Sequence, residues 1–224
     1  MPLPAPDPWT RQIARRVAYL WPLKAVGTMV FMGIFFWAYF SVLRAPLGVP
    51  SVMPLTVVDR WIPFSVHAFP AYASLWVYAS LTPALLREFR PLASFGLWMA
   101  AMCLFCLGVF WLYPTMVPAP DIDWALYPEM SVLKGVDASG NACPSLHVAS
   151  AVFTAIWLNR ILRSVAAPPF LDALNWALCL AILWSTIATR QHVVIDVLAG
   201  GLVGVTFALL ALRQVFGSLR AAEI

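Results

Sequence analysis

Long apolar runs separated by short polar segments constrain this chain more than any other feature of its sequence. A helix that crosses a bilayer needs about 20 apolar residues, and runs of this kind recur along most of the chain. Hydrophobic residues make up 62% of the 224 residues, and charged residues only 11%. A soluble domain of this size could not bury so much apolar surface. The sequence therefore predicts an all-α, polytopic membrane protein.

Six of these runs are interpreted as transmembrane helices. They cover about 23–43, 66–86, 92–113, 146–162, 172–190 and 192–215. Only Arg190 and Gln191 separate the last two helices, which are therefore expected to form a tight hairpin. The chain is expected to comprise a basic amphipathic segment (1–21), a six-helix membrane catalytic domain (22–216) and a short cytoplasmic tail (217–224). The N-terminal segment is interpreted as a helix on the membrane surface, with a frayed tail as the alternative.

The distribution of lysine and arginine predicts the orientation of the bundle. With a cytoplasmic N-terminus, ten of the 14 basic residues lie inside. Arg44, Arg60, Lys134 and Arg190 lie outside. Cytoplasmic loops carry an excess of basic residues, so both termini are expected to be cytoplasmic. The loop 114–145 and the starts of the fourth and sixth helices then share the extracytoplasmic side of a plasma membrane or bacterial inner membrane.

Two of the three histidines stand at the starts of these two helices. His192 lies in "TRQHVVIDVLAG", four residues before Asp196. On one helix these two side chains would share a face, and the carboxylate would hold Nδ1–H and leave Nε2 as a nucleophile or base. An ionisable group one turn into an apolar helix is a candidate for function. A structural His–Asp pair that braces the bundle is the alternative.

Phosphate-binding groups are expected beside both histidines. Arg190 precedes His192, and a guanidinium beside a helix N-terminus suits an anion. In "CPSLHVA", Ser145 is a plausible N-cap and His147 follows on the first turn. Taken alone, each motif has a structural alternative. Arg190 could be an arginine at the membrane interface, and Ser145 could be an ordinary helix cap. Together these groups could attack a phosphorus atom, stabilise its charge and protonate a leaving oxygen.

At these residues the chain resembles the type-2 phosphatidic acid phosphatase superfamily. "CPSLHVA" is similar to its second motif, and "TRQHVVIDVLAG" is similar to a shortened form of its third. The short form is closer to the branch of inositol phosphorylceramide and sphingomyelin synthases, as are "DRWIPF" and "YPTMVPAP". The resemblance implies that His192 forms a phosphohistidine and that Asp196 orients it. It further implies that His147 protonates the leaving oxygen, and that Arg190 and Ser145 hold phosphate oxygens.

The superfamily's first motif, K-x6-R-P, has no full counterpart in this chain. Arg90–Pro91 supplies its end, but residue 83 is proline and this loop is expected to be cytoplasmic. One phosphate-binding cation is therefore unassigned. Lys134 is favoured for this role because it lies in the loop before the second motif, with Arg60 and Arg44 as alternatives.

The function expected from the sequence is a lipid phosphatase or phosphotransferase that needs no metal or cofactor. Lipid-linked phosphate is the expected substrate, membrane lipids are the expected partners and nucleic acid is not, while the sequence leaves the oligomeric state open. Transfer of a headgroup, as in the synthase branch, is the first alternative. A transporter or channel is the second, but its path would need several ionisable groups at mid-depth. An inactive scaffold is the third, although the set of His147, Arg190, His192 and Asp196 is intact.

Overall fold

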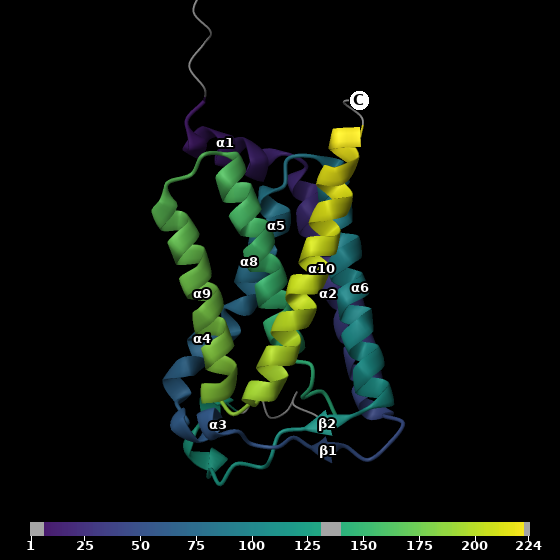
Figure 1. Ribbon diagram of the computed structural model, residues 1–224, viewed down its shortest axis with the longest axis vertical. Helices are drawn as coiled ribbons and strands as arrows, with labels where there is room; N and C mark the ends of the chain where they lie inside the picture. Colours follow the sequence, from purple (N-terminus) through teal and green to yellow (C-terminus); the bar gives the residue numbers. More distant parts are fainter. Residues whose placement is uncertain (1–6, 131–139, 222–224) are drawn as a thin grey trace, which may run out of the picture.

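The computed structural model describes residues 7–130 and 140–221, and these residues form an all-α bundle (Figure 1). Its long helices follow the predicted runs within a few residues. They are α2 (Trp21–Arg44), α6 (Phe89–Leu112), α8 (Leu146–Ser164), α9 (Pro169–Ala188) and α10 (Val194–Ala221). The last helix begins two residues later than predicted and continues beyond residue 216.

The second predicted span is a broken helix. The segment 66–86 contains the 3₁₀ helix η1 (Val66–Ala68), α4 (Phe69–Ala73) and α5 (Leu75–Leu85). Pro83 lies inside α5, where it cannot donate a backbone hydrogen bond. The break brings Tyr72, on α4, against the start of α8.

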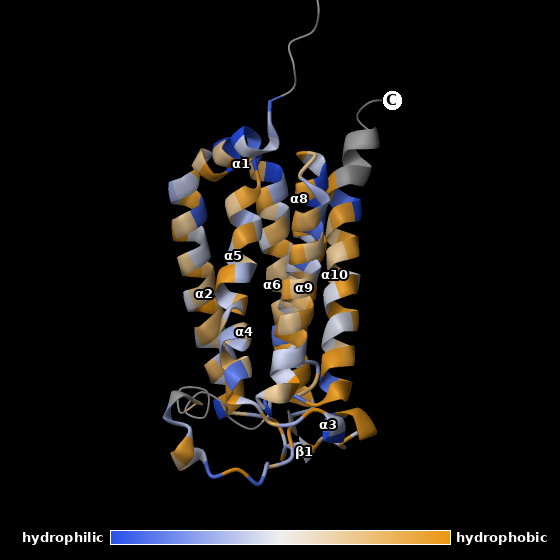
Figure 2. Cartoon of the chain, turned by 90° about the vertical axis from the view of Figure 1, so that its left-hand side faces the viewer, coloured by the Kyte–Doolittle hydropathy of each residue, from blue (hydrophilic) through white to orange (hydrophobic). Residues whose placement is uncertain are grey.

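Four helices in the described part of the chain are long and apolar enough to cross a membrane: α2, α6, α9 and α10. α8 is not among these four, and many of its side chains are buried against protein, including Phe153 and Trp157. Figure 2 shows that hydrophobic residues are frequent along the long helices, and many large hydrophobic side chains, such as Trp37 and Leu104, are exposed. Water would disfavour such a surface, whereas lipid would not. The full count of six spans stays a prediction.

α8 lies between α9 and α10 (Figure 1). The connection from α9 to α10 is short, as expected, but the two helices barely contact each other because each packs on α8. The predicted tight hairpin is therefore wrong as a packing unit. Phe95 of α6 packs its ring against Phe153 and Trp157, which extends the core to the other side of α8.

Two glycines allow α10 to approach α8 closely. A Cβ atom at Gly200 would lie 2.3 Å from the Ser145 carbonyl oxygen, and one at Gly204 would lie 2.5 Å from the Ala149 carbonyl oxygen. Small residues four apart let two membrane helices bring their backbones together. This contact fixes the starts of α8 and α10 side by side.

Short elements cover the end of the bundle where α8 and α10 begin (Figure 1). β1 (Ser51–Val52) pairs in parallel with β2 (Thr115–Met116). The helices α3 (Val57–Trp61), η2 (Trp124–Leu126) and η3 (Pro128–Met130) also belong to the connecting segments. The amphipathic helix α1 (Trp9–Ala18) lies across the opposite end, where α10 also finishes. Both ends of the described chain thus share one end of the bundle, and which side of a membrane this is stays a prediction.

Candidate active site

The start of α8 is capped by Ser145, as the sequence predicts. Its hydroxyl oxygen accepts a hydrogen bond from the Val148 N–H at 3.2 Å. Its own N–H donates to the Asp196 carbonyl oxygen at 3.0 Å, which ties the start of α8 to the first turn of α10. Ser145 is fully buried. A phosphate-binding role for its helix head stays a prediction.

His147, on the first turn of α8, is held by α4. Its ring stacks on the Tyr72 ring, with 4.0 Å between centroids and 17° between planes. Its Nε2 lies 3.0 Å from the Tyr72 carbonyl oxygen, and a carbonyl can only accept, so Nε2–H is the donor. The Trp76 ring meets His147 edge-on. These contacts fix the ring plane and occupy Nε2.

Arg190 occupies an unusual backbone position after α9. Its N–H bonds to the Ile187 carbonyl, and the Gln191 N–H bonds to the Thr186 carbonyl, each at 3.0 Å. These two bonds form the Schellman turn that commonly ends a helix. Arg190 sits at the left-handed position of this turn, with φ of 59°, where glycine is usual because other residues are strained. A non-glycine residue here points to a role for its side chain.

The Arg190 guanidinium spans the gap to the segment 59–62. Nη1 donates to the Asp59 carbonyl oxygen at 3.2 Å, and Nη2 donates to the Ile62 carbonyl oxygen at 2.9 Å. A guanidinium has five N–H donors, so these two bonds leave donors for an anion. The predicted phosphate-binding residue is thus also a brace between the turn at 189–193 and α3.

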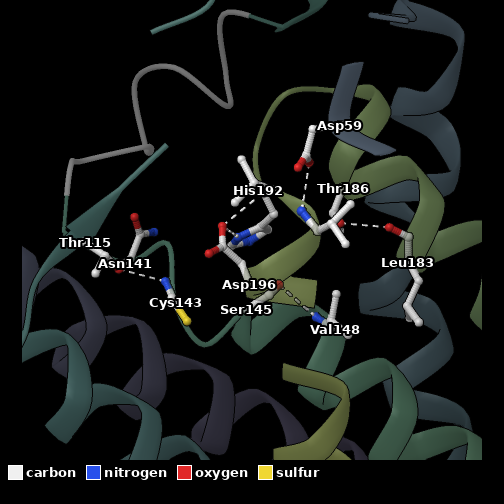
Figure 3. Close-up of polar contacts among 12 residues, drawn as sticks. Asp59, Thr115, Asn141, Cys143, Ser145, Val148, Leu183, Thr186, His192 and Asp196 are labelled. Carbon is white, nitrogen blue, oxygen red and sulfur yellow. Dashed lines mark hydrogen bonds and ion pairs between the residues drawn. The ribbon is translucent and has the colours of Figure 1, made fainter. Parts of the chain in front are cut away.

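His192 lies before α10 rather than on it, since the helix begins at Val194. The expectation that His192 and Asp196 share a helix face is therefore wrong, because the turn that ends α9 extends through His192, whose N–H donates to the Thr186 carbonyl. The two side chains nevertheless face each other (Figure 3). His192 Nδ1 lies 3.6 Å from Asp196 Oδ2, which is longer than a hydrogen bond and becomes an ion pair when the ring is protonated.

Asp196 is fully buried in the first turn of α10. Its Oδ2 accepts a hydrogen bond from the Val193 N–H at 3.0 Å, which fixes the carboxylate against the turn that carries His192. Its Oδ1 has no hydrogen-bond partner among the described residues. A buried carboxylate with one free oxygen can rotate toward His192 when that ring becomes charged, because the opposite charge compensates the cost of burial.

Asp59 completes this arrangement, although the sequence-based reasoning did not select it. Its Oδ2 accepts from the Thr56 N–H and hydroxyl, each at 2.7 Å, and its Oδ1 accepts from the Val194 N–H at 2.8 Å. One buried carboxylate therefore caps both α3 and α10 (Figure 3). A Thr-x-x-acid pattern is the sequence signal of a capping box, and Thr56 to Asp59 fit it.

The segment that leads into α8 is fixed to the other connecting loops. The Cys143 N–H donates to the Thr115 hydroxyl at 2.8 Å, and the Asn141 side chain bonds to the Tyr39 hydroxyl of α2. Burial, and then the nearby Asp196 carboxylate, raises the pKa of the Cys143 thiol. The thiol therefore stays protonated at neutral pH and is a poor nucleophile.

A cavity of about 1330 Å³ opens beside the two histidines. His147, Gln191, His192 and Asn141 line one end of it, and most of the remaining lining is apolar and comes from α2, α5 and α6. Ser145, Arg190 and Asp196 are not among the residues that line this cavity. The structure brings both histidines to one space, as the sequence predicts.

Lys134, the residue favoured for the unassigned phosphate-binding cation, falls outside the described residues. The two alternatives, Arg44 and Arg60, are exposed and do not line the cavity. Arg90 lies at the start of α6, at the end of the bundle that carries α1 and far along the helix from β2.

The described residues contain no group of three or more His, Cys, Asp or Glu that could hold a metal ion. Metal independence stays a prediction.

A comparison with known protein families identifies the chain. The sequence model of the PAP2 superfamily matches residues 91–220, more than half of the chain. The chain belongs to the PAP2 superfamily. Searches of the curated proteins and of the solved structures each gave no match.

Membership of the PAP2 superfamily agrees with the two histidine motifs, since both lie inside the matched residues. Together with the four apolar helices, it indicates a membrane protein of a phosphatase or phosphotransferase family that acts on lipid phosphates. The match does not distinguish branches of the superfamily, so the relation to the inositol phosphorylceramide and sphingomyelin synthases stays a prediction. Asp59 and Tyr72, which hold the two histidine segments, precede the matched residues.

Proposed function

We propose that this protein is an integral membrane enzyme that removes or transfers the phosphate group of a lipid through a phosphohistidine on His192. One observation carries the proposal: His147 and His192 line the same end of one apolar cavity, and Asp196 Oδ2 lies 3.6 Å from His192 Nδ1. A polar end with two imidazoles suits a phosphate, and the apolar walls suit a hydrocarbon chain.

The first step is displacement at phosphorus. His192 Nε2 attacks, a P–N bond forms, and the P–O bond to the lipid alcohol breaks. The electron pair leaves with that oxygen, which takes the Nδ1 proton of His147 in its protonated imidazolium form, and His147 is left neutral with its remaining proton on Nε2. Asp196 stabilises the positive imidazole ring of the phosphohistidine. As the carboxylate beside His192, it also fixes the tautomer of the ring.

The second step releases the phosphoryl group. Neutral His147 takes a proton from water, the water oxygen attacks phosphorus, and the P–N bond breaks to give inorganic phosphate. If an alcohol takes the place of water, the same step yields a new phosphate ester. In the alternative function, headgroup transfer of the inositol phosphorylceramide or sphingomyelin synthase type, the substrate is a phosphodiester, the headgroup stays on the transferred phosphorus, and the acceptor alcohol gives a new phosphodiester. The short spacing from Arg190 to His192 favours this alternative.

The negative charge on the phosphate oxygens must be stabilised by cationic groups. The free N–H groups of Arg190 are proposed to serve this purpose, with the helix head at Ser145 and with Lys134. The ten-to-four distribution of basic residues supports a site on the extracytoplasmic side of a plasma membrane or bacterial inner membrane.

The test uses purified protein in detergent with lipid phosphates, pyrophosphates and phosphodiesters, with and without an acceptor alcohol. Phosphate release without the alcohol supports hydrolysis, and a new lipid with it supports transfer. His192→Ala should abolish turnover and the acid-labile radiolabelled phosphoenzyme, while His67→Ala, on η1, serves as a control. Turnover that survives His192→Ala would rule out the phosphohistidine mechanism.

A further inference from the structure

The cavity beside the histidines extends far beyond the space that a phosphate group needs. Its lining on α2 runs from Leu23 to Phe40, which at 1.5 Å per residue corresponds to about 26 Å along the helix. On α6 it runs from Phe89 to Phe110. The hydrocarbon core of a bilayer is about 30 Å thick, so the cavity covers most of the depth of the bundle.

The polar groups of this cavity are concentrated at its two ends. Tyr39 lies at the level of the site, because its hydroxyl bonds to Asn141. At the far end, the Lys24 ammonium donates to the Arg16 and Ala84 carbonyl oxygens, at 2.6 and 2.9 Å. Between these ends the lining is mostly aliphatic and aromatic. A ligand that fits has one anionic head and one long apolar tail.

Two glycines keep the far part of this cavity open. Gly27 on α2 and Gly96 on α6 both line it, and a Cβ atom built on either would meet no other atom within 4 Å. Gly27 is twelve residues before Tyr39, about 18 Å along the helix from the level of the site. Lys24 lies only one helical turn beyond Gly27. A larger side chain at either glycine would therefore fill the space just before the polar end.

We propose that the cavity holds the hydrocarbon chain of the substrate and that Gly27 and Gly96 set the longest chain it accepts. The proposal rests on the proposed function for the position of the phosphate, at His147 and His192. The chain then lies between α2 and α6 and ends near Lys24. The substrate class is a phosphate ester of a long-chain alcohol or acylated lipid, selected by chain length at a point about 18 Å from the chemistry.

Two matched positions serve as controls. Gly33 on α2 and Gly108 on α6 also have open space above their Cα atoms, but neither lines the cavity. The variants to compare are therefore Gly27→Phe with Gly33→Phe, and Gly96→Phe with Gly108→Phe. Phenylalanine has a higher helix propensity than glycine, so none of the four should weaken its helix.

The probes are octyl and octadecyl phosphonate, whose P–C bond the proposed reaction cannot cleave. Binding is measured in detergent by competition with a fluorescent lipid. Gly27→Phe and Gly96→Phe should weaken octadecyl phosphonate binding roughly tenfold, because two or more methylenes lose their buried contacts, and should leave octyl phosphonate binding unchanged. The two control variants should bind both probes like wild type.

The outcomes separate this proposal from the proposed function. Unchanged octadecyl binding in both cavity variants, equal losses for both probes, or the same loss in the controls would each overturn chain selection at the glycines. Phosphate release from octyl and octadecyl phosphate, and new lipid formed when an acceptor alcohol is added, are measured in parallel with wild-type protein. The absence of both would overturn the proposed function, whereas the phosphonate result would still report on the cavity.

Discussion

Gly200 lies so close to Ser145 that any side chain on the glycine would collide with the Ser145 carbonyl oxygen, which would be 2.3 Å from its Cβ atom. Ser145 caps the helix of His147, and Gly200 is one turn beyond Asp196. The relative position of the two histidine segments thus depends on a backbone contact between α8 and α10. This contact also accounts for the hydrogen bond from the Ser145 N–H to the Asp196 carbonyl.

Gly200→Ala should therefore separate the starts of the two helices. Overpacking of this kind costs about 1–3 kcal/mol of stability, and a shift of about 1 Å at a site can lower the rate on the order of 100-fold. Thermal unfolding in detergent and kcat are the measurements. Gly201→Ala is the control, since a Cβ atom there meets nothing within 4 Å. Equal behaviour of the two variants would show that the close contact does not position the site.

Arg190→Gly should affect activity more than stability. Glycine relieves the left-handed backbone conformation, which offsets the two lost hydrogen bonds, so the free energy of unfolding should change by no more than about 1 kcal/mol. Loss of a donor to the phosphate should lower kcat/KM on the order of 100-fold. Arg190→Lys, which keeps the charge without the guanidinium fork, should lose less. Full activity of the glycine variant would reduce Arg190 to a structural brace.

The loss of activity in His147→Ala should depend on the leaving group of the substrate. An alkyl phosphate needs a proton on its leaving oxygen, and general acid catalysis is worth roughly 10²–10⁴-fold. Activity on an alkyl phosphate should fall by that factor, while p-nitrophenyl phosphate, whose leaving group is a weak base, should retain a larger fraction. Equal losses on both substrates would instead assign His147 to phosphate binding or to helix capping.

Lys134→Met tests the cation that lies outside the described residues. If Lys134 binds the phosphate equally in the ground state and the transition state, the variant should raise KM and lower kcat only slightly. Arg44→Met and Arg60→Met, at two exposed positions, are the comparison variants. Wild-type kinetics for Lys134→Met would return the role to one of these arginines or to none.

The long helices were predictable because hydrophobic run length alone defines them, and the proximity of His147 and His192 was predictable because polar groups are scarce in such runs. The break at Ser74 and the true start of α10 were not, since both depend on tertiary contacts. The capping role of Asp59 was not predictable for a similar reason. Its partner Val194 is 135 residues away, and only the folded chain shows that it caps a second helix.

That distance has a consequence for how the protein is made. Asp59 and Tyr72 are synthesised and inserted long before the segments they hold, so the early part of the chain must wait in the membrane until α8 and α10 arrive. A fragment that begins at residue 91 would contain the whole segment that matches the superfamily and yet lack the acceptors for the Val194 N–H and for His147 Nε2. We therefore expect the first 90 residues to serve as a template on which α8 and α10 assemble the two histidine segments.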